Sequence, residues 1–336
     1  MEETAPTPSK NVARVARRLF SSEEEQGLFV HALSRGGAAQ TAVAWLRSAG
    51  SEKPFVCAER PSWLPAWIDV AAAGERPGKS ELHERGDIYC LDLSSTFACA
   101  AFSEIAIPAP LVIDVCAAPG GKGILAQRYL SPSFTVGNEV IRKRTAPLIS
   151  NYKRCLIDPA IVVSYDPQKL AEICGPVAQV VIVDAPCSGQ SLVMKNKAAP
   201  GAFHPATISM NERRQRRILA NSRALVTEGG YLLYSTCTFS RDENEDVVEW
   251  FLERFPAFEA VPVAALAAFR SHLSSEPCYR LWPHQGLGAG SFTALFRLKA
   301  EPQVETSVED RSADDLENRG TLISNLWSVW RSSSLS

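Results

Sequence analysis

Long apolar stretches are missing from this 336-residue sequence, in which nothing approaches the ~18 consecutive apolar residues of a membrane span. The first residues, MEETAPTPSKNVARVARRLF, lack the apolar core of a signal peptide, so a cytoplasmic location is expected. None of the nine cysteines forms a Cys-x-x-Cys pair, which excludes a zinc knuckle and disfavours a secreted disulfide scaffold. No metal site is implied, and we expect the cysteines to remain thiols in a reducing compartment.

A strong charge of one sign is also lacking, because the net charge is only -2. The charge is unevenly spread: residues 301–319 hold seven acidic and two basic side chains, so the rest of the chain carries about +3. Basic residues cluster in four places, namely Arg14 with Arg17 and Arg18, residues 142–144, Lys195 with Lys197, and residues 213–217. Such clusters are either solvated faces or contacts for nucleic-acid phosphates, and their position beside candidate site loops favours the second interpretation.

The composition is that of an ordinary globular protein, with 46% hydrophobic and 21% charged residues. Its length predicts one large domain and a smaller one. We expect an N-terminal helical and small α/β module at 1–104, a larger α/β domain at 105–300 and an acidic, flexible tail at 301–336. Within the module, residues 10–50 show helical spacing of apolar residues, with Ser21 or Ser22 as the N-cap before Glu23.

From Leu111 onwards, strand-like apolar runs alternate with helical patterns. We expect strands at 111–115, 134–139, 160–164, 179–184 and 230–235, and helices at 122–130, 142–153, 207–226 and 243–254. Residues 278–298 are expected to add a closing pair of antiparallel strands. This alternation predicts a Rossmann-like α/β fold, with a mostly parallel, doubly wound sheet and helices on both of its faces.

Two cysteines stand where such strands end, Cys187 in VDAPCSG and Cys237 in YSTCTFS. In an open α/β sheet, ligands bind in the crevice beyond the carboxyl ends of the strands, so both thiols can reach one pocket. Because a thiolate attacks a cytosine ring at C6, a pair of thiols in that place suggests chemistry on a base. The alternative is that both are small buried apolar side chains, as most free cysteines are.

A loop that suits a cofactor follows the first strand of this region, in LVIDVCAAPGGKG. It matches neither GxxxxGK[ST] nor GxGxxG, the common phosphate-binding patterns. Its small residues allow close backbone approach, and the helix that it opens offers free N–H groups. Glu139 and Asp166, at the ends of the next two strands, are placed to bind ribose hydroxyls and an adenine edge. These features favour S-adenosylmethionine over NAD, against the alternative of a structural glycine-rich turn.

Four segments together carry a resemblance to a known family: DVCAAPGGKG, GNEVIRKR, DAPCSG and STCTFSRDENEDVV. They resemble the RsmB/Nop/Sun family of S-adenosylmethionine-dependent RNA cytosine-C5 methyltransferases, and most of all its bacterial RsmF-type rRNA methyltransferases. The match extends from Gly86 to Lys299 and implies a class I methyltransferase domain at 105–300 preceded by an RNA-binding module. The sequence departs from the family pattern after PCSG, where Gln190, Ser191 and Leu192 stand in place of the more usual Glu-Gly.

This resemblance implies roles for individual residues. The family nucleophile falls on Cys237, and Cys187 falls on the thiol that assists release of the covalent adduct. We expect the Asp184 carboxyl group to contact N3 of the cytosine, and Lys122 is a candidate for lowering the pKa of the nucleophile. Cofactor contacts are expected at Cys116, Ala117, Ala118, Pro119, Gly120, Gly121, Lys122, Glu139, Asp166 and Asp184.

The implied substrate is RNA whose target base leaves its stack, in a single-stranded loop or by flipping. We expect ribosomal RNA and a monomeric enzyme. The alternatives are the same reaction on tRNA, and a non-catalytic RNA-binding ribosome-assembly factor, which the presence of both thiols disfavours. Arg213 or Arg217 is a candidate phosphate contact and His284 a candidate substrate-loop residue, each against a purely structural alternative.

Overall fold

The computed structural model describes residues 9–37, 40–47 and 53–300, and the tail expected at 301–336 lies outside these ranges. The chain begins with helices α1 (Lys10–Leu19) and α2 (Glu23–Arg35). Ser22 is confirmed as the N-cap of α2, because its hydroxyl accepts a hydrogen bond from the Glu25 N–H at 3.4 Å. Gly36, in a left-handed conformation at φ +57°, follows the last turn and ends this helix.

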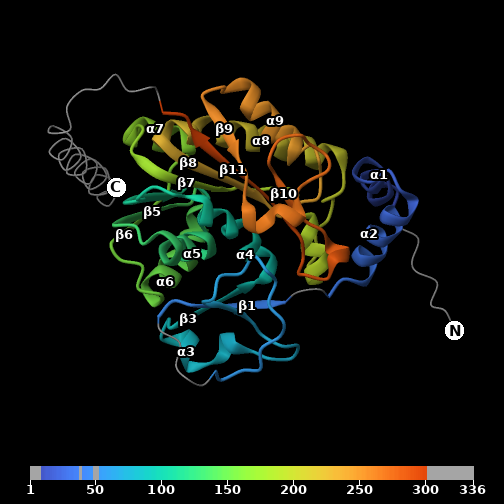
Figure 1. Cartoon of the computed structure of the whole chain (residues 1–336), viewed down its shortest axis with the longest axis horizontal. Coiled ribbons are helices and arrows are strands. Elements are labelled where there is room, and N and C mark those ends of the chain that lie inside the picture. The colour runs from blue at the N-terminus through green and yellow to red at the C-terminus, as the bar shows by residue number, and fades with distance from the viewer. Residues whose placement is uncertain (1–8, 38–39, 48–52, 301–336) are drawn as a thin grey trace.

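A three-stranded antiparallel sheet follows, formed in the order β2-β1-β3 by β1 (Thr41–Trp45), β2 (Ile68–Val70) and β3 (Ile88–Asp92), with α3 (Glu81–Glu84) before β3. It lies below the main body in Figure 1. The helical prediction for residues 10–50 is therefore wrong at β1. Residues 42–45 are all buried, and a short apolar run buried on both faces has no periodicity that separates a strand from a helix.

The larger sheet confirms the expected Rossmann-like fold, with the strand order β10-β11-β8-β7-β4-β5-β6 (Figure 1). The strands β4 to β8 are mutually parallel, whereas β11 pairs antiparallel with β8, β9 and β10. Their bounds are β4 (Leu111–Asp114), β5 (Phe134–Asn138), β6 (Ala160–Val163), β7 (Ala178–Asp184), β8 (Val226–Thr236), β9 (Phe258–Val261), β10 (Tyr279–Leu281) and β11 (Ser291–Leu298).

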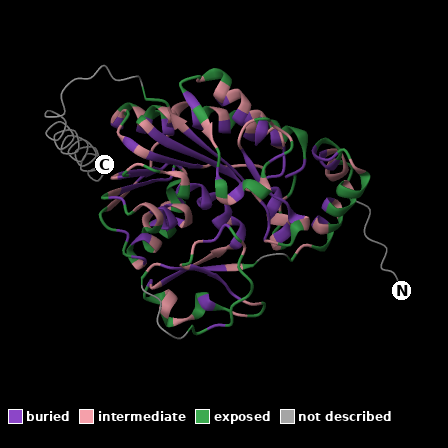
Figure 2. Cartoon of the chain, viewed as in Figure 1, coloured by how far each residue is buried: buried purple, intermediate pink, exposed green. Residues whose placement is uncertain are grey.

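Helices cover both faces of this sheet. One face packs against α4 (Leu93–Cys99), α5 (Gly121–Leu130) and α6 (Thr145–Arg154), and the other against α7 (Pro167–Cys174), α8 (Pro205–Ser222) and α9 (Glu245–Arg254). Figure 2 shows the strands of this sheet coloured mostly as buried, whereas the helices around them carry the exposed residues. The helix α7 and the strand β9 were not predicted, and α8 ends at Ser222, earlier than expected. No helix in the described ranges is long and apolar enough to cross a membrane.

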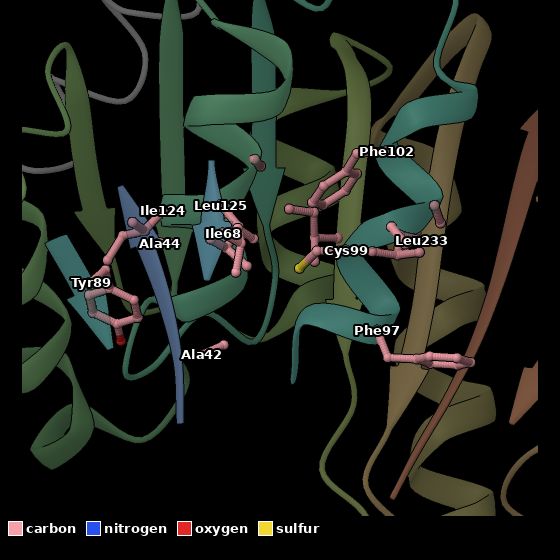
Figure 3. Close-up of a cluster of buried hydrophobic side chains, with 14 of the residues drawn as sticks. Ala42, Ala44, Ile68, Tyr89, Phe97, Cys99, Phe102, Ile124, Leu125 and Leu233 are labelled. Atoms are coloured by element: carbon pink, nitrogen blue, oxygen red, sulfur yellow. The ribbon is translucent and has the colours of Figure 1, made fainter. Parts of the chain in front are cut away.

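One apolar core joins the small sheet to the large one. Figure 3 shows Ala44 and Ile68 of the small sheet, Phe97 of α4, Leu125 of α5 and Leu233 of β8, all fully buried members of the same cluster. Close packing of this kind is hardly compressible, so the start of α4 is held in place relative to the strand ends of the large sheet.

Candidate active site

Cys187 and Cys237 leave the large sheet from two neighbouring parallel strands, β7 and β8, whose last paired residues are Asp184 and Ser235. The two Sγ atoms lie 3.2 Å apart, and either thiol can donate the hydrogen bond between them. Both cysteines are half-buried. The strand order therefore brings together two thiols that are 50 residues apart in the sequence.

The two thiols differ in acidity. The hydrogen bond with Cys187 lowers the pKa of Cys237, and the Ser191 hydroxyl and the Lys195 ammonium act in the same direction, against burial and the charge of Asp184. The same hydrogen bond, together with burial and the charge of Cys237, raises the pKa of Cys187 well above its usual value. Cys237 is therefore the thiol that ionises first, while Cys187 stays protonated beside it.

A cavity of about 580 Å³ opens in front of the thiols, at the carboxyl ends of the parallel strands. This volume lies in the range of small-molecule and cofactor sites. Most residues expected at the site line it, namely Cys116, Ala118, Lys122, Glu139, Asp166, Asp184, Cys187 and Cys237. The other expected residues belong to the loop before α5 or to its first turn but do not line this cavity, namely Ala117, Pro119, Gly120 and Gly121.

Two carboxylates lie on the side of the cavity formed by β5 and β6. The Glu139 carboxylate accepts a hydrogen bond from the Ile141 N–H at 2.9 Å, and its other oxygen lies 3.0 Å from the Arg144 guanidinium. Asp166 caps α7, and its free oxygen lies 3.4 Å from the Arg217 guanidinium. Acidic groups thus follow two successive strands, as the sequence predicts, and each is paired with an arginine.

The loop between β4 and α5 requires glycine at its turn. Gly120 has φ +114°, and a side chain there would approach Leu148 and Tyr152 to 3.2 Å. Directly before the loop, Asp114 is buried and its Oδ1 atom has no hydrogen-bond partner. Burial, and then the charge of Asp184, raises the pKa of Asp114 to about 7. The sequence reasoning missed Asp114, although its place as the acid that ends the first strand is a usable signal.

The cation expected near the nucleophile forms an ion pair instead. Lys122 Nζ lies 2.7 Å from Asp184 Oδ2, and the Ser235 hydroxyl donates to Asp184 Oδ1 at 3.0 Å. Burial acts to lower the pKa of Lys122, but the charge and hydrogen bond of Asp184 and the charges of Cys99 and Asp114 together outweigh it, so the pKa is raised. The ammonium that lowers the pKa of Cys237 is that of Lys195.

Several lining residues come from outside the strand ends and were not predicted. They are Ser94 and Ser95 of α4, Leu192 of the short helix η4 (Gln190–Lys195), and Gly290 and Ser291 at the start of β11. Asp92, the N-cap of α4, lies 3.5 Å from Lys195, which ties α4 to η4. The segment lies inside the stretch that resembles the family, and the Asp-x-Ser start of α4 is a local signal for it in the sequence.

Gln190 and Ser191, which stand where Glu-Gly is more usual after PCSG, are hydrogen-bonded to the loop of Cys237. Gln190 is fully buried; its amide nitrogen donates to the Ala202 carbonyl at 3.1 Å, and its amide oxygen accepts from the Phe239 N–H at 3.0 Å. The Ser191 N–H donates to the Cys237 carbonyl at 3.1 Å. These bonds fix the position of η4 relative to the second thiol.

Of the remaining candidates, Arg217 lies at the cavity, whereas Arg213 and His284 do not. Arg217 lines the cavity, whereas Arg213 does not and donates from its Nε to the Ser209 carbonyl at 3.3 Å. His284 packs in an aromatic cluster with Phe20 and Trp282, and burial lowers its pKa. It does not line the cavity, which favours its structural interpretation.

Known proteins resemble this chain in sequence. The family model for 16S rRNA methyltransferase RsmB/F matches residues 108–297. The ribosomal RNA small subunit methyltransferase F of Cronobacter sakazakii is 32% identical over 247 residues, 71% of this chain and 51% of that protein. The chain thus spans about half the length of the curated relatives it matches.

Solved structures share the fold. NSun6 from Pyrococcus horikoshii superposes with a TM-score of 0.67 at 18% identity, covering 87% of this chain and 98% of that one. A methyltransferase homologue from the same organism superposes with a TM-score of 0.65 at 21% identity, covering 86% and 99%. With the matched family model spanning more than half of its residues, the chain belongs to the 16S rRNA methyltransferase RsmB/F family.

Proposed function

We propose that this protein is an S-adenosylmethionine-dependent RNA cytosine-C5 methyltransferase that acts through a covalent bond between Cys237 and C6 of the target base. The observation that carries this proposal is the pair of Sγ atoms 3.2 Å apart at one cavity, with Glu139 and Asp166 on the other side of the same cavity. One thiol is needed to attack the base and the second to assist its release.

The cavity fits the proposed cofactor. Glu139 and Asp166 line it and supply carboxylates for ribose hydroxyls and an adenine edge. Asp114, at the end of β4 but outside the cavity lining, has a buried oxygen that still lacks a hydrogen-bond partner. Cys116 and Ala118 line the cavity from the loop that opens α5. Bound there, S-adenosylmethionine would supply an electrophilic methyl group on a sulfonium.

The reaction would begin at Cys237, whose thiolate forms a bond to C6 of the cytosine. The electron pair of the C5–C6 double bond would form a double bond between C4 and C5, and that of the C4–N3 double bond would move to N3. With the ion pair of Asp184 and Lys122 at N3, the Lys122 ammonium would offset the negative charge that develops there. The ion pair of 2.7 Å holds this carboxylate in one orientation. C5 is then electron-rich enough to accept the methyl group.

Release would reverse the first step. A general base would take the proton from C5, and the electron pair of that C–H bond would re-form the double bond between C5 and C6. The bond between C6 and sulfur would then break, and its electron pair would return to Cys237 as a thiolate. Cys187, whose raised pKa keeps it protonated, can donate a hydrogen bond to the departing sulfur across the 3.2 Å between them. Removal of Cys187 is therefore expected to slow release more than attack.

RNA would reach the cavity over a basic rim. Arg214 and Arg217 of α8 and Lys195 of η4 line the cavity, and Arg142 and Lys143 are exposed. Such side chains suit phosphate contacts beside a base that has left its stack. The segment 1–104 is proposed to add RNA contacts. Small-subunit ribosomal RNA is the proposed substrate because of the family match, with tRNA as the alternative.

Bisulfite sequencing of total RNA from a deletion strain tests the reaction and identifies the target. We expect one cytidine to lose its protection, wild-type protein and Cys174→Ala to restore it, and Cys237→Ala to fail. Cys174 is a buried thiol of α7 and serves as the matched control. Loss of no site would contradict the proposal and favour a non-catalytic RNA-binding role, and full activity of Cys237→Ala would remove the nucleophile assignment.

A further inference from the structure

Ser191 holds a buried hydroxyl, and its backbone is bonded to that of Cys237. The residue lies in η4 and is 1% exposed, and its N–H donates to the Cys237 carbonyl at 3.1 Å. In the described structure its Oγ atom has no hydrogen-bond partner apart from the weakly accepting thiol of Cys237. An unpartnered buried hydroxyl is uncommon, because it loses its bonds to water and gains nothing in return.

When Cys237 ionises, its thiolate can serve as a strong acceptor for the Ser191 hydroxyl. A neutral thiol is a weak acceptor, whereas a thiolate accepts strong, charge-assisted hydrogen bonds. The desolvation cost of the Ser191 hydroxyl is thus present while Cys237 is protonated and is relieved when it ionises. The hydroxyl therefore favours the charged form of its neighbour without contacting substrate or cofactor.

We propose that Ser191 is a positioning residue whose hydroxyl donates a hydrogen bond to the Cys237 thiolate and so increases the fraction of enzyme that is ready to attack. The proposal rests on the proposed function only in taking Cys237 as the nucleophile. The ionisation of Cys237 and the geometry of the hydroxyl are properties of the free protein.

Other groups also face Cys237, and their effects must be separated from that of Ser191. Cys187 has the largest effect, and its hydrogen bond lowers the pKa of Cys237; the Ser191 hydroxyl and the Lys195 ammonium lower it further, while burial and the charge of Asp184 raise it. Ser191→Ala leaves all the other groups in place. It also keeps the backbone hydrogen bond to the Cys237 carbonyl, so the position of η4 is retained.

The test measures the rate at which iodoacetamide alkylates Cys237 in the full-length protein, without RNA or cofactor, as a function of pH. The thiolate sulfur bonds to the methylene carbon and iodide leaves, so the rate follows the thiolate fraction. Site-resolved mass spectrometry separates Cys237 from Cys187. In Ser191→Ala and Ser191→Gly we expect the midpoint of the alkylation rate's pH profile to rise by about one pH unit. This is the shift that the loss of one hydrogen bond to a charged group would cause.

Ser222→Ala is the matched control, because Ser222 in α8 also has a fully buried hydroxyl without a partner. It should leave the alkylation midpoint unchanged. The thermal midpoint of Ser191→Ala should equal or exceed that of the wild type, since an unsatisfied polar group has been removed. An unchanged alkylation midpoint in both Ser191 variants would overturn the proposal and leave the methyltransferase assignment intact.

Discussion

Glu243 accepts two hydrogen bonds from Ser188, the residue after Cys187: one from the backbone N–H at 2.8 Å and one from the hydroxyl at 2.5 Å. The same carboxylate lies 3.3 Å from the Thr238 hydroxyl, in the residue after Cys237. It is fully buried. Glu243 therefore joins the two loops that carry the thiols.

Glu243→Gln should weaken this connection, because the amide has one acceptor oxygen where the carboxylate has two. We expect a loss of roughly 1–3 kcal/mol in the free energy of unfolding and a larger fractional loss of methyl transfer. Urea denaturation and a methyl-transfer assay measure the two effects. Glu249→Gln, a half-exposed residue of α9, is the control and should change neither. Wild-type activity in Glu243→Gln would show that the loops hold their places without it.

Gln190→Glu restores the acid that is more usual after PCSG, and we expect it to destabilise this chain. The Gln190 amide donates to the Ala202 carbonyl, and a carboxylate cannot do so. The cost should be about 1–3 kcal/mol or more, because the new group is fully buried. Gln168→Glu, at an exposed position of α7, should cost under about 0.5 kcal/mol. Equal stability of both variants in urea would contradict this account of Gln190.

Asp114 makes stability depend on pH. Its pKa is raised from 3.8 to about 7, so the folded protein holds a proton that the unfolded chain releases. The resulting stabilisation is fully present below the unfolded pKa and is lost as the pH rises through 7. Asp114→Asn, which mimics the protonated form, should gain stability relative to wild type between about pH 5 and 8, by a few kcal/mol at most. Glu59→Gln, at an exposed position, is the control, and its stability should change with pH as that of the wild type does. If the free energy of unfolding changed with pH in the same way in wild type and Asp114→Asn, the assigned pKa would be contradicted.

Much of the large sheet is predictable because its central strands are buried on both faces. The runs at β4, β7 and β8 are therefore almost continuously apolar, and each is followed by a loop. The same property misled the prediction at β1, where a short apolar run was extended from the preceding helices. The helix α7 was missed although Asp166 and Pro167 form an N-cap and a first-turn proline.

In the site, too, some features could be predicted from the sequence and others could not. The rule that ligands bind beyond the carboxyl ends of strands placed Glu139, Asp166, Cys187 and Cys237 at one cavity. The pairing of Lys122 with Asp184 could not be predicted in this way, because it depends on how segments far apart in the sequence pack. The same is true of the Ser191 hydroxyl beside Cys237, which depends on the fold of η4 and its buried glutamine.

The covalent adduct is the most direct test of the account. Purified Cys187→Ala would be mixed with S-adenosylmethionine and total RNA from a strain that lacks the protein, and then run on a denaturing gel. We predict an RNA–protein complex that resists denaturation, because attack by Cys237 proceeds while release is slowed. The double variant Cys187→Ala, Cys237→Ala should form none. Absence of the complex in the single variant, or its persistence in the double variant, would contradict the assignment of attack to Cys237 and release to Cys187.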